Sequence, residues 1–230
     1  MVQRFARDSR RRKLLLRLLP PAGLMPLACL VLLSADIIDR IAISVGNQVI
    51  TESQIDEEVR VTQFLNGEQL DLSAGERKKA ASRLIEQAFV KREMELSRYP
   101  LPPLSDADKQ LEMLKAGYPS EAQFQDALRT YGIAEDALRR HLAWQLTLLR
   151  FVEFRFRPGI QVQDSDVQEY YKQQVAKWQK EGTKSIPSFE EARGQIEEIL
   201  TQQRVDEAMD RWLSEVRMQV SVRYRDETLQ

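Results

Sequence analysis

Apolar side chains recur along most of this chain at the spacing of amphipathic α-helices. Runs with apolar positions three and four residues apart predict helices over residues 51–66, 73–97, 105–117, 120–131, 134–156, 164–178 and 188–216. Most of these runs begin at Ser, Thr or Asp, and most end at Gly or Pro, as helices commonly do. The pattern predicts a mainly α-helical protein.

Two helix starts match the capping box, in which a Ser or Thr and an acid or amide three residues later bond each other's backbone. Thr51 pairs with Gln54 in this pattern, and Ser73 pairs with Glu76. Ser105 and Ser120 are predicted to cap the two helices that follow.

Strand patterns lie on either side of the helical region. Residues 37–50 alternate in polarity around Gly46-Asn47, which predicts a β-hairpin. Residues 220–224 alternate in the same way. Because an isolated hairpin is only marginally stable, we expect the C-terminal strand to join it.

The N-terminal residues have the order of a secretory signal. A basic run at residues 10–13 precedes apolar runs at residues 14–19 and 24–33, and then Ser34 and Ala35 follow. We predict a signal peptide over residues 1–35 that is cleaved near Ala35, by either the general or the twin-arginine route. The alternative is an uncleaved inner-membrane anchor. Cys29, the one cysteine, lies inside this segment.

Charge is distributed unevenly between the signal and the rest. Residues 1–35 hold seven of the 34 basic residues and one of the 35 acidic residues, so the remainder has a net charge of about −7. An acidic body argues against a nucleic-acid partner, because phosphate binding requires a basic face.

Residues with catalytic potential are present, but no arrangement of them indicates an enzyme. His141 is the single histidine, with Gln145 one helical turn away and no second metal ligand at that spacing. Carboxylate pairs such as Glu52 and Asp56 are expected on solvated helix faces. Nucleotide-binding and nucleophile motifs are absent from the sequence. We therefore predict no enzymatic activity, no cofactor and no metal.

Several large apolar residues lie near the ends of the predicted helices. Methionine and aromatic side chains at such places can line an adaptable binding surface, although ordinary packing is their more common role. The candidate binding residues are Met113, Tyr118, Phe124, Phe154 and Phe156.

The order of these elements resembles that of SurA-type periplasmic chaperones. The resemblance covers nearly all of residues 37–225. It rests on residues 38–55 (strand, turn, strand and helix start), 83–87, 105–108, 131–133, 162–171, 189–213 and 220–222. It implies a helical chaperone module over residues 36–178 and a C-terminal helix and strand over residues 188–230 that pack back on this module.

One part of that family's pattern is missing. Residues 179–187 form a short polar linker where the family carries a parvulin prolyl-isomerase domain. The resemblance therefore implies a periplasmic chaperone that holds unfolded outer-membrane or secreted clients in an apolar cleft without ATP and without a small-molecule substrate. The alternatives are a degenerate prolyl isomerase and a membrane-anchored assembly protein with one dedicated partner.

Overall fold

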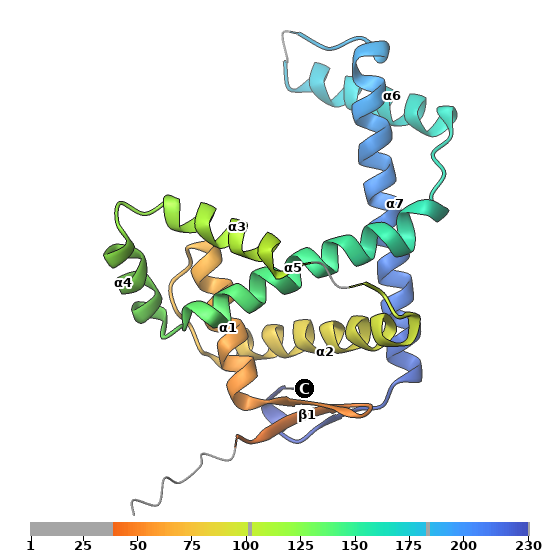
Figure 1. Ribbon diagram of the computed structural model, residues 1–230. Helices are drawn as coiled ribbons and strands as arrows, with labels where there is room; N and C mark the ends of the chain where they lie inside the picture. Colours follow the sequence, from red (N-terminus) through yellow and green to blue (C-terminus); the bar gives the residue numbers. More distant parts are fainter. Residues whose placement is uncertain (1–38, 101–102, 183–184, 230) are drawn as a thin grey trace, which may run out of the picture. The chain divides into compact units, whose positions relative to one another are not determined.

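The computed structural model describes residues 39–100, 103–182 and 185–229. This part of the chain contains seven α-helices and one small sheet (Figure 1), so the predicted mainly α-helical fold is confirmed. The predicted signal peptide, its cleavage near Ala35 and the alternative anchor lie outside the described residues. Within those residues, no helix has both the length and the apolar character needed to span a membrane.

Three antiparallel strands form the sheet in the order β2-β1-β3. They are β1 (Ile41–Val45), β2 (Gln48–Thr51) and β3 (Val222–Tyr224). Gly46 turns the hairpin with a φ of 58°, a left-handed conformation that glycine adopts at little cost. β3 pairs with β1 over Ile43–Val45, so the predicted hairpin and its joining by a C-terminal strand are both confirmed.

The seven helices follow the predicted order closely. They are α1 (Glu52–Asn66), α2 (Ala74–Ser97), α3 (Leu104–Ala116), α4 (Glu121–Tyr131), α5 (Glu135–Phe156), α6 (Asp164–Lys180) and α7 (Phe189–Gln219). A short 3₁₀ turn, Arg157–Gly159, follows α5, and another, Glu227–Leu229, follows β3.

Helix capping agrees with the sequence at α1 and differs at α2 and α3. The predicted box of Thr51 and Gln54 forms at the start of α1. At α2 the predicted box is wrong: Ser73 makes no capping bond, and its hydroxyl donates to Asp71 at 3.0 Å. The cap of α3 is Pro103, not Ser105. At α4, Ser120 caps as predicted.

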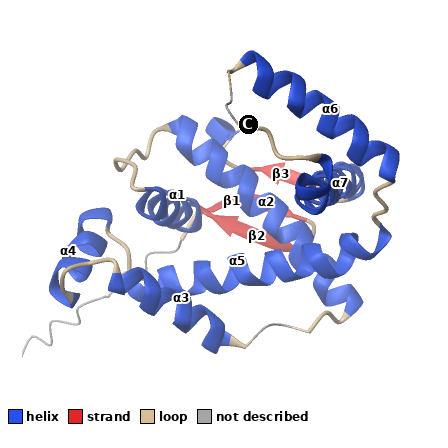
Figure 2. Ribbon diagram, turned by 90° about the horizontal axis from the view of Figure 1, so that it is seen from above, coloured by secondary structure: helices blue, strands red, loops and turns tan. Residues whose placement is uncertain are grey.

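Helices α1 and α2 pack on the sheet and build one core with it (Figure 2). Ile43 and Ile50 of the sheet contribute buried side chains, and Ile55 of α1 and Phe89 of α2 join them. A second core lies where α3 and α4 meet α1 and α5. Its buried residues include Phe64, Phe124, Leu128 and Leu138.

Helix α7 runs from α6 to the sheet. Its C-terminal half packs on α2 and α5, where Trp212 lies 6.1 Å from Phe151 and 6.0 Å from Phe156 between ring centroids. The chain then enters β3 beside the N-terminal hairpin. The N-terminal half of α7 instead packs on α6 through a separate cluster around Val167 and Ile196.

Candidate functional site

Several hollows of this helical fold lie between α2 and α5. Both helices contact α1, and both contact α7 near Trp212. The region between these contacts is lined by Gln87 and Lys91 from α2 and by His141 and Trp144 from α5. We call it the α2–α5 seam.

Three hollows meet at Trp144 in this seam. The His141 cavity, of about 320 Å³, has Val90, Leu148 and Met209 among its lining residues. The Lys91 pocket, of about 600 Å³, is lined by Lys91, Met94, Glu95, Arg98, Tyr99, Arg140, Ala143, Trp144 and Thr147. The sheet-side hollow, of about 340 Å³, reaches β2.

These hollows open on two faces of the seam. Arg83, Gln87 and Val90 of α2 are spaced three and four residues apart and line the His141 cavity. Lys91, Glu95 and Arg98 have the same spacing and line the Lys91 pocket. Since residues at this spacing lie close together on a helix surface, each hollow is lined by its own row of α2 residues, and Trp144 lines both.

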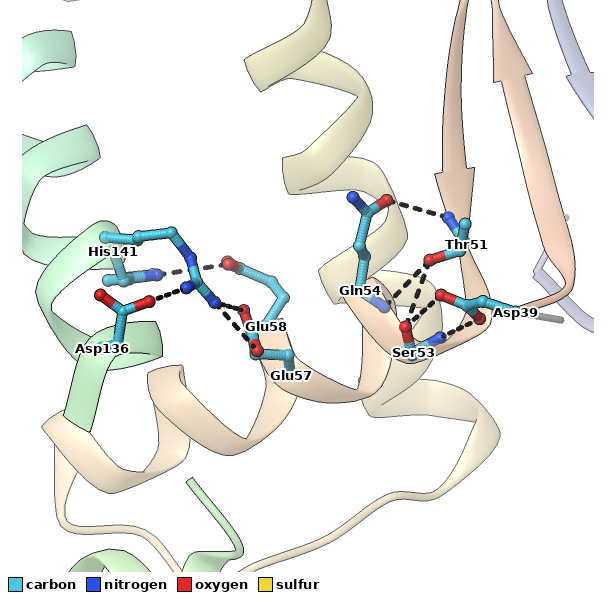
Figure 3. A network of polar contacts seen from close by, with 9 residues as sticks. Asp39, Thr51, Ser53, Gln54, Glu57, Glu58, Asp136 and His141 are labelled. Carbon is cyan, nitrogen blue, oxygen red and sulfur yellow. Dashed lines mark hydrogen bonds and ion pairs between the residues drawn. The ribbon is translucent and has the colours of Figure 1, made fainter. Parts of the chain in front are cut away.

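A buried polar network joins the three helices beside Trp144. Glu58 of α1 is only 7% exposed. Its carboxylate accepts a hydrogen bond from Arg83 Nε of α2 at 2.9 Å and lies 3.3 Å from His141 Nδ1 of α5. Figure 3 shows Glu58 and His141 pointing toward each other across the seam. The network therefore fixes α1, α2 and α5 against one another.

The charge state of Glu58 follows from these partners. Burial alone would raise the pKa of Glu58, but hydrogen bonds from His141 and Arg83 and the nearby positive charge lower it below the ordinary value of 4.5. Glu58 is therefore ionised at neutral pH, as a buried carboxylate with two donors can be.

A second, more exposed ion pair lies next to the network. Glu57 is adjacent to Glu58 but points to the surface, where it pairs with Arg140 of α5 at 3.2 Å. Arg140 also pairs with Asp136 one turn earlier. Arg140 lines both the Lys91 pocket and the sheet-side hollow, and its charge is already balanced there.

Lys91 is placed differently from Arg140. Its ammonium lies 4.9 Å from the centre of the Trp144 ring, within range of a cation–π contact. Burial in the seam lowers the pKa of Lys91 below its ordinary value of 10.5, and the charge of Glu58 opposes that shift. Lys91 is nonetheless exposed, and no carboxylate of the described residues forms an ion pair with it.

The five candidate residues predicted from sequence do not form one surface. Met113 of α3 is 76% exposed and Phe154 of α5 is 67% exposed. Phe124 and Phe156 are buried in two different cores, where ordinary packing describes them. Tyr118 is partly buried and packs edge-on against Phe124 at 5.3 Å. A binding role for any of the five stays a prediction.

His141 has its hydrogen-bonding positions filled within the network. Nδ1 faces Glu58, and the Gln145 side-chain amide lies 3.1 Å from Nε2. Across the described residues no group of three or more His, Cys, Asp or Glu is placed to hold a metal ion. The sequence pattern indicated the contact with Gln145 but gave no signal for Glu58, which is 83 residues away.

Comparisons with known proteins give no assignment for this arrangement. Neither protein-family models nor curated proteins match the chain.

Proposed function

We propose that this protein is an exported, ATP-independent chaperone that holds unfolded polypeptide segments at the α2–α5 seam. The observation that supports it best is the meeting of three hollows at Trp144, with apolar lining from the partly exposed Leu148 and Met209. Unfolded segments expose apolar side chains, and such hollows remove them from water without demanding one sequence.

The composition of the seam suits a weak and adaptable binder. Met94 and Met209 are flexible enough to repack around different side chains, while Trp144 offers a large rigid contact. Beyond the hollows, Phe154 and Leu96 are exposed on the same two helices. Several modest contacts of this kind give reversible binding, which a holding chaperone needs.

The proposal predicts that the purified full-length chain suppresses aggregation of an outer-membrane β-barrel protein diluted from urea, at stoichiometric ratios and without ATP. Replacing Trp144 with alanine should raise the concentration needed for half-suppression about tenfold, since a central tryptophan contact is worth about 1–2 kcal/mol. Light scattering measures both effects.

Trp178→Ala is the matched control, because Trp178 lies on α6 and lines none of the three hollows. We expect it to suppress aggregation as well as the unmodified chain. If a tenfold excess of the unmodified chain leaves light scattering unchanged, the chaperone proposal is wrong. If both tryptophan variants lose suppression equally, the binding surface lies elsewhere.

A further inference from the structure

The Lys91 pocket contains two cations that no carboxylate of the described residues neutralises. Lys91 and Arg98 lie seven residues apart on one face of α2, and neither forms an ion pair there. Glu95 lies between them in sequence and also lines the pocket, but it makes no salt bridge to either. Arg140 is balanced by Glu57 and Asp136. The two remaining cations, Lys91 and Arg98, outnumber Glu95, so the pocket keeps a net positive charge.

Arg98 is held in an unusual conformation at this pocket. It follows α2 with a φ of 52°, and it is the one non-glycine residue with positive φ in the described part of the chain. Glycine is the usual residue at such a helix end, because a Cβ makes this conformation less favourable. An arginine that lines the pocket thus stands where glycine would be less strained.

Between the cations, the pocket is apolar and aromatic. Met94, Tyr99 and Trp144 line it, and its volume of about 600 Å³ is large enough for more than one side chain. The ring of Phe154 continues this surface outward, 5.3 Å from the ring of Tyr99. The pocket therefore presents a place for an apolar ring beside Lys91 and Arg98, two cations that outnumber the one carboxylate of Glu95.

We propose that the Lys91 pocket selects unfolded segments in which an aromatic residue is next to an aspartate or glutamate. The aromatic ring packs against Met94 and Tyr99, and the carboxylate lies between Lys91 and Arg98. This inference rests on the proposed function, since it names the class of segment that the seam binds.

The electrostatics of the pocket favour this occupant over a neutral one. Lys91 and Arg98 are exposed and form no ion pair, so an arriving carboxylate meets two positive charges against the one negative charge of Glu95. A flexible segment with a lysine beside its aromatic residue would instead meet like charge, which discriminates against it.

Fluorescence anisotropy with three labelled, unstructured peptides tests the inference on the full-length chain. The peptides are identical except that their central phenylalanines are flanked by aspartate, asparagine or lysine. We expect the aspartate peptide to bind about tenfold more tightly than the asparagine peptide, and the lysine peptide to bind most weakly. Added salt should reduce the difference between the three.

Arg98→Gly is the informative variant, because glycine suits the positive φ and should not destabilise the fold. It should weaken the aspartate peptide about fivefold and leave the asparagine peptide unchanged. Arg92→Gln is the control: Arg92 is an exposed cation on α2 that does not line the pocket, so no peptide should be affected.

The outcomes separate this inference from the proposed function. Equal affinity for the three peptides, with aggregation suppression intact, overturns the inference alone. Equal effects of Arg98→Gly and Arg92→Gln also overturn it. Failure of every peptide to bind, together with no suppression of aggregation, overturns the chaperone proposal itself.

Discussion

Replacing Phe151 with alanine is expected to destabilise the protein by about 3–5 kcal/mol, the range for removing a fully buried phenylalanine. Phe151 is 1% exposed. It packs against Tyr99 at 5.7 Å, Phe156 at 6.2 Å and Trp212 at 6.1 Å between ring centroids. Because these partners follow α2, end α5 and belong to α7, the substitution leaves a cavity where the three elements meet. Urea denaturation measures the loss.

Phe154→Ala is the matched control on the same helix. Phe154 is one helical turn from the core position and is mostly exposed, with Tyr99 as its ring partner. We expect the control to lose less than about 1 kcal/mol. Similar losses for the two variants would mean that the junction of α2, α5 and α7 is not the rigid frame of the seam.

Replacing Glu58 with glutamine is expected to cost about 2–3 kcal/mol at neutral pH. The substitution keeps the volume but removes the charge that accepts from Arg83 and His141. Hydrogen bonds to a charged group contribute more than neutral ones, and removing one member of a buried pair leaves the others unsatisfied. Thermal and urea unfolding of the two proteins measure the difference.

The pH dependence of this loss follows from the lowered pKa of Glu58. A carboxylate with a lowered pKa stabilises the folded state above its ordinary value of 4.5, and the contribution disappears as pH falls through the folded-state pKa. The difference in stability between the unmodified protein and Glu58→Gln should therefore be full near neutral pH and should shrink as pH falls below 4.5 through the lowered pKa of Glu58.

Glu57→Gln serves as the control for Glu58, since it removes the neighbouring but exposed carboxylate. Glu57 forms a surface pair with Arg140, and such pairs contribute about 0–1 kcal/mol. A Glu58→Gln variant as stable as Glu57→Gln at neutral pH would contradict the structural role of the buried network.

Local signals in the sequence predicted most of the fold. Helix α1 begins at the capping box of Thr51 and Gln54 and ends at Gly67, as these residue types indicate. Such signals are readable because capping depends on neighbours within a few positions. The prediction failed at Ser73, whose side chain bonds Asp71 two residues earlier and accepts no bond from the first turn of α2. Pairing of β3 with β1 was predicted from alternation and from the weakness of a lone hairpin.

The candidate site was much less predictable, because its residues come together only in the folded chain. Glu58, Arg83 and His141 belong to three helices, and nothing in their local spacing marks them as partners. The seven-residue spacing of Lys91 and Arg98 can be read from the sequence. The contact of Lys91 with Trp144 cannot, because Trp144 belongs to α5. Phe124 was a candidate binding residue because of its position near a helix start, and that position did not reveal its burial in the core.

The central claim is that unfolded segments bind at the α2–α5 seam, and site-specific photocrosslinking tests it most directly. A photoreactive residue is placed at Gln145, an exposed position that lines the His141 cavity, and separately at Gln173, an exposed position on α6. We expect an unfolded outer-membrane client to crosslink strongly at position 145 and weakly at position 173. Equal crosslinking at both positions, or crosslinking at position 173 alone, would contradict the claim.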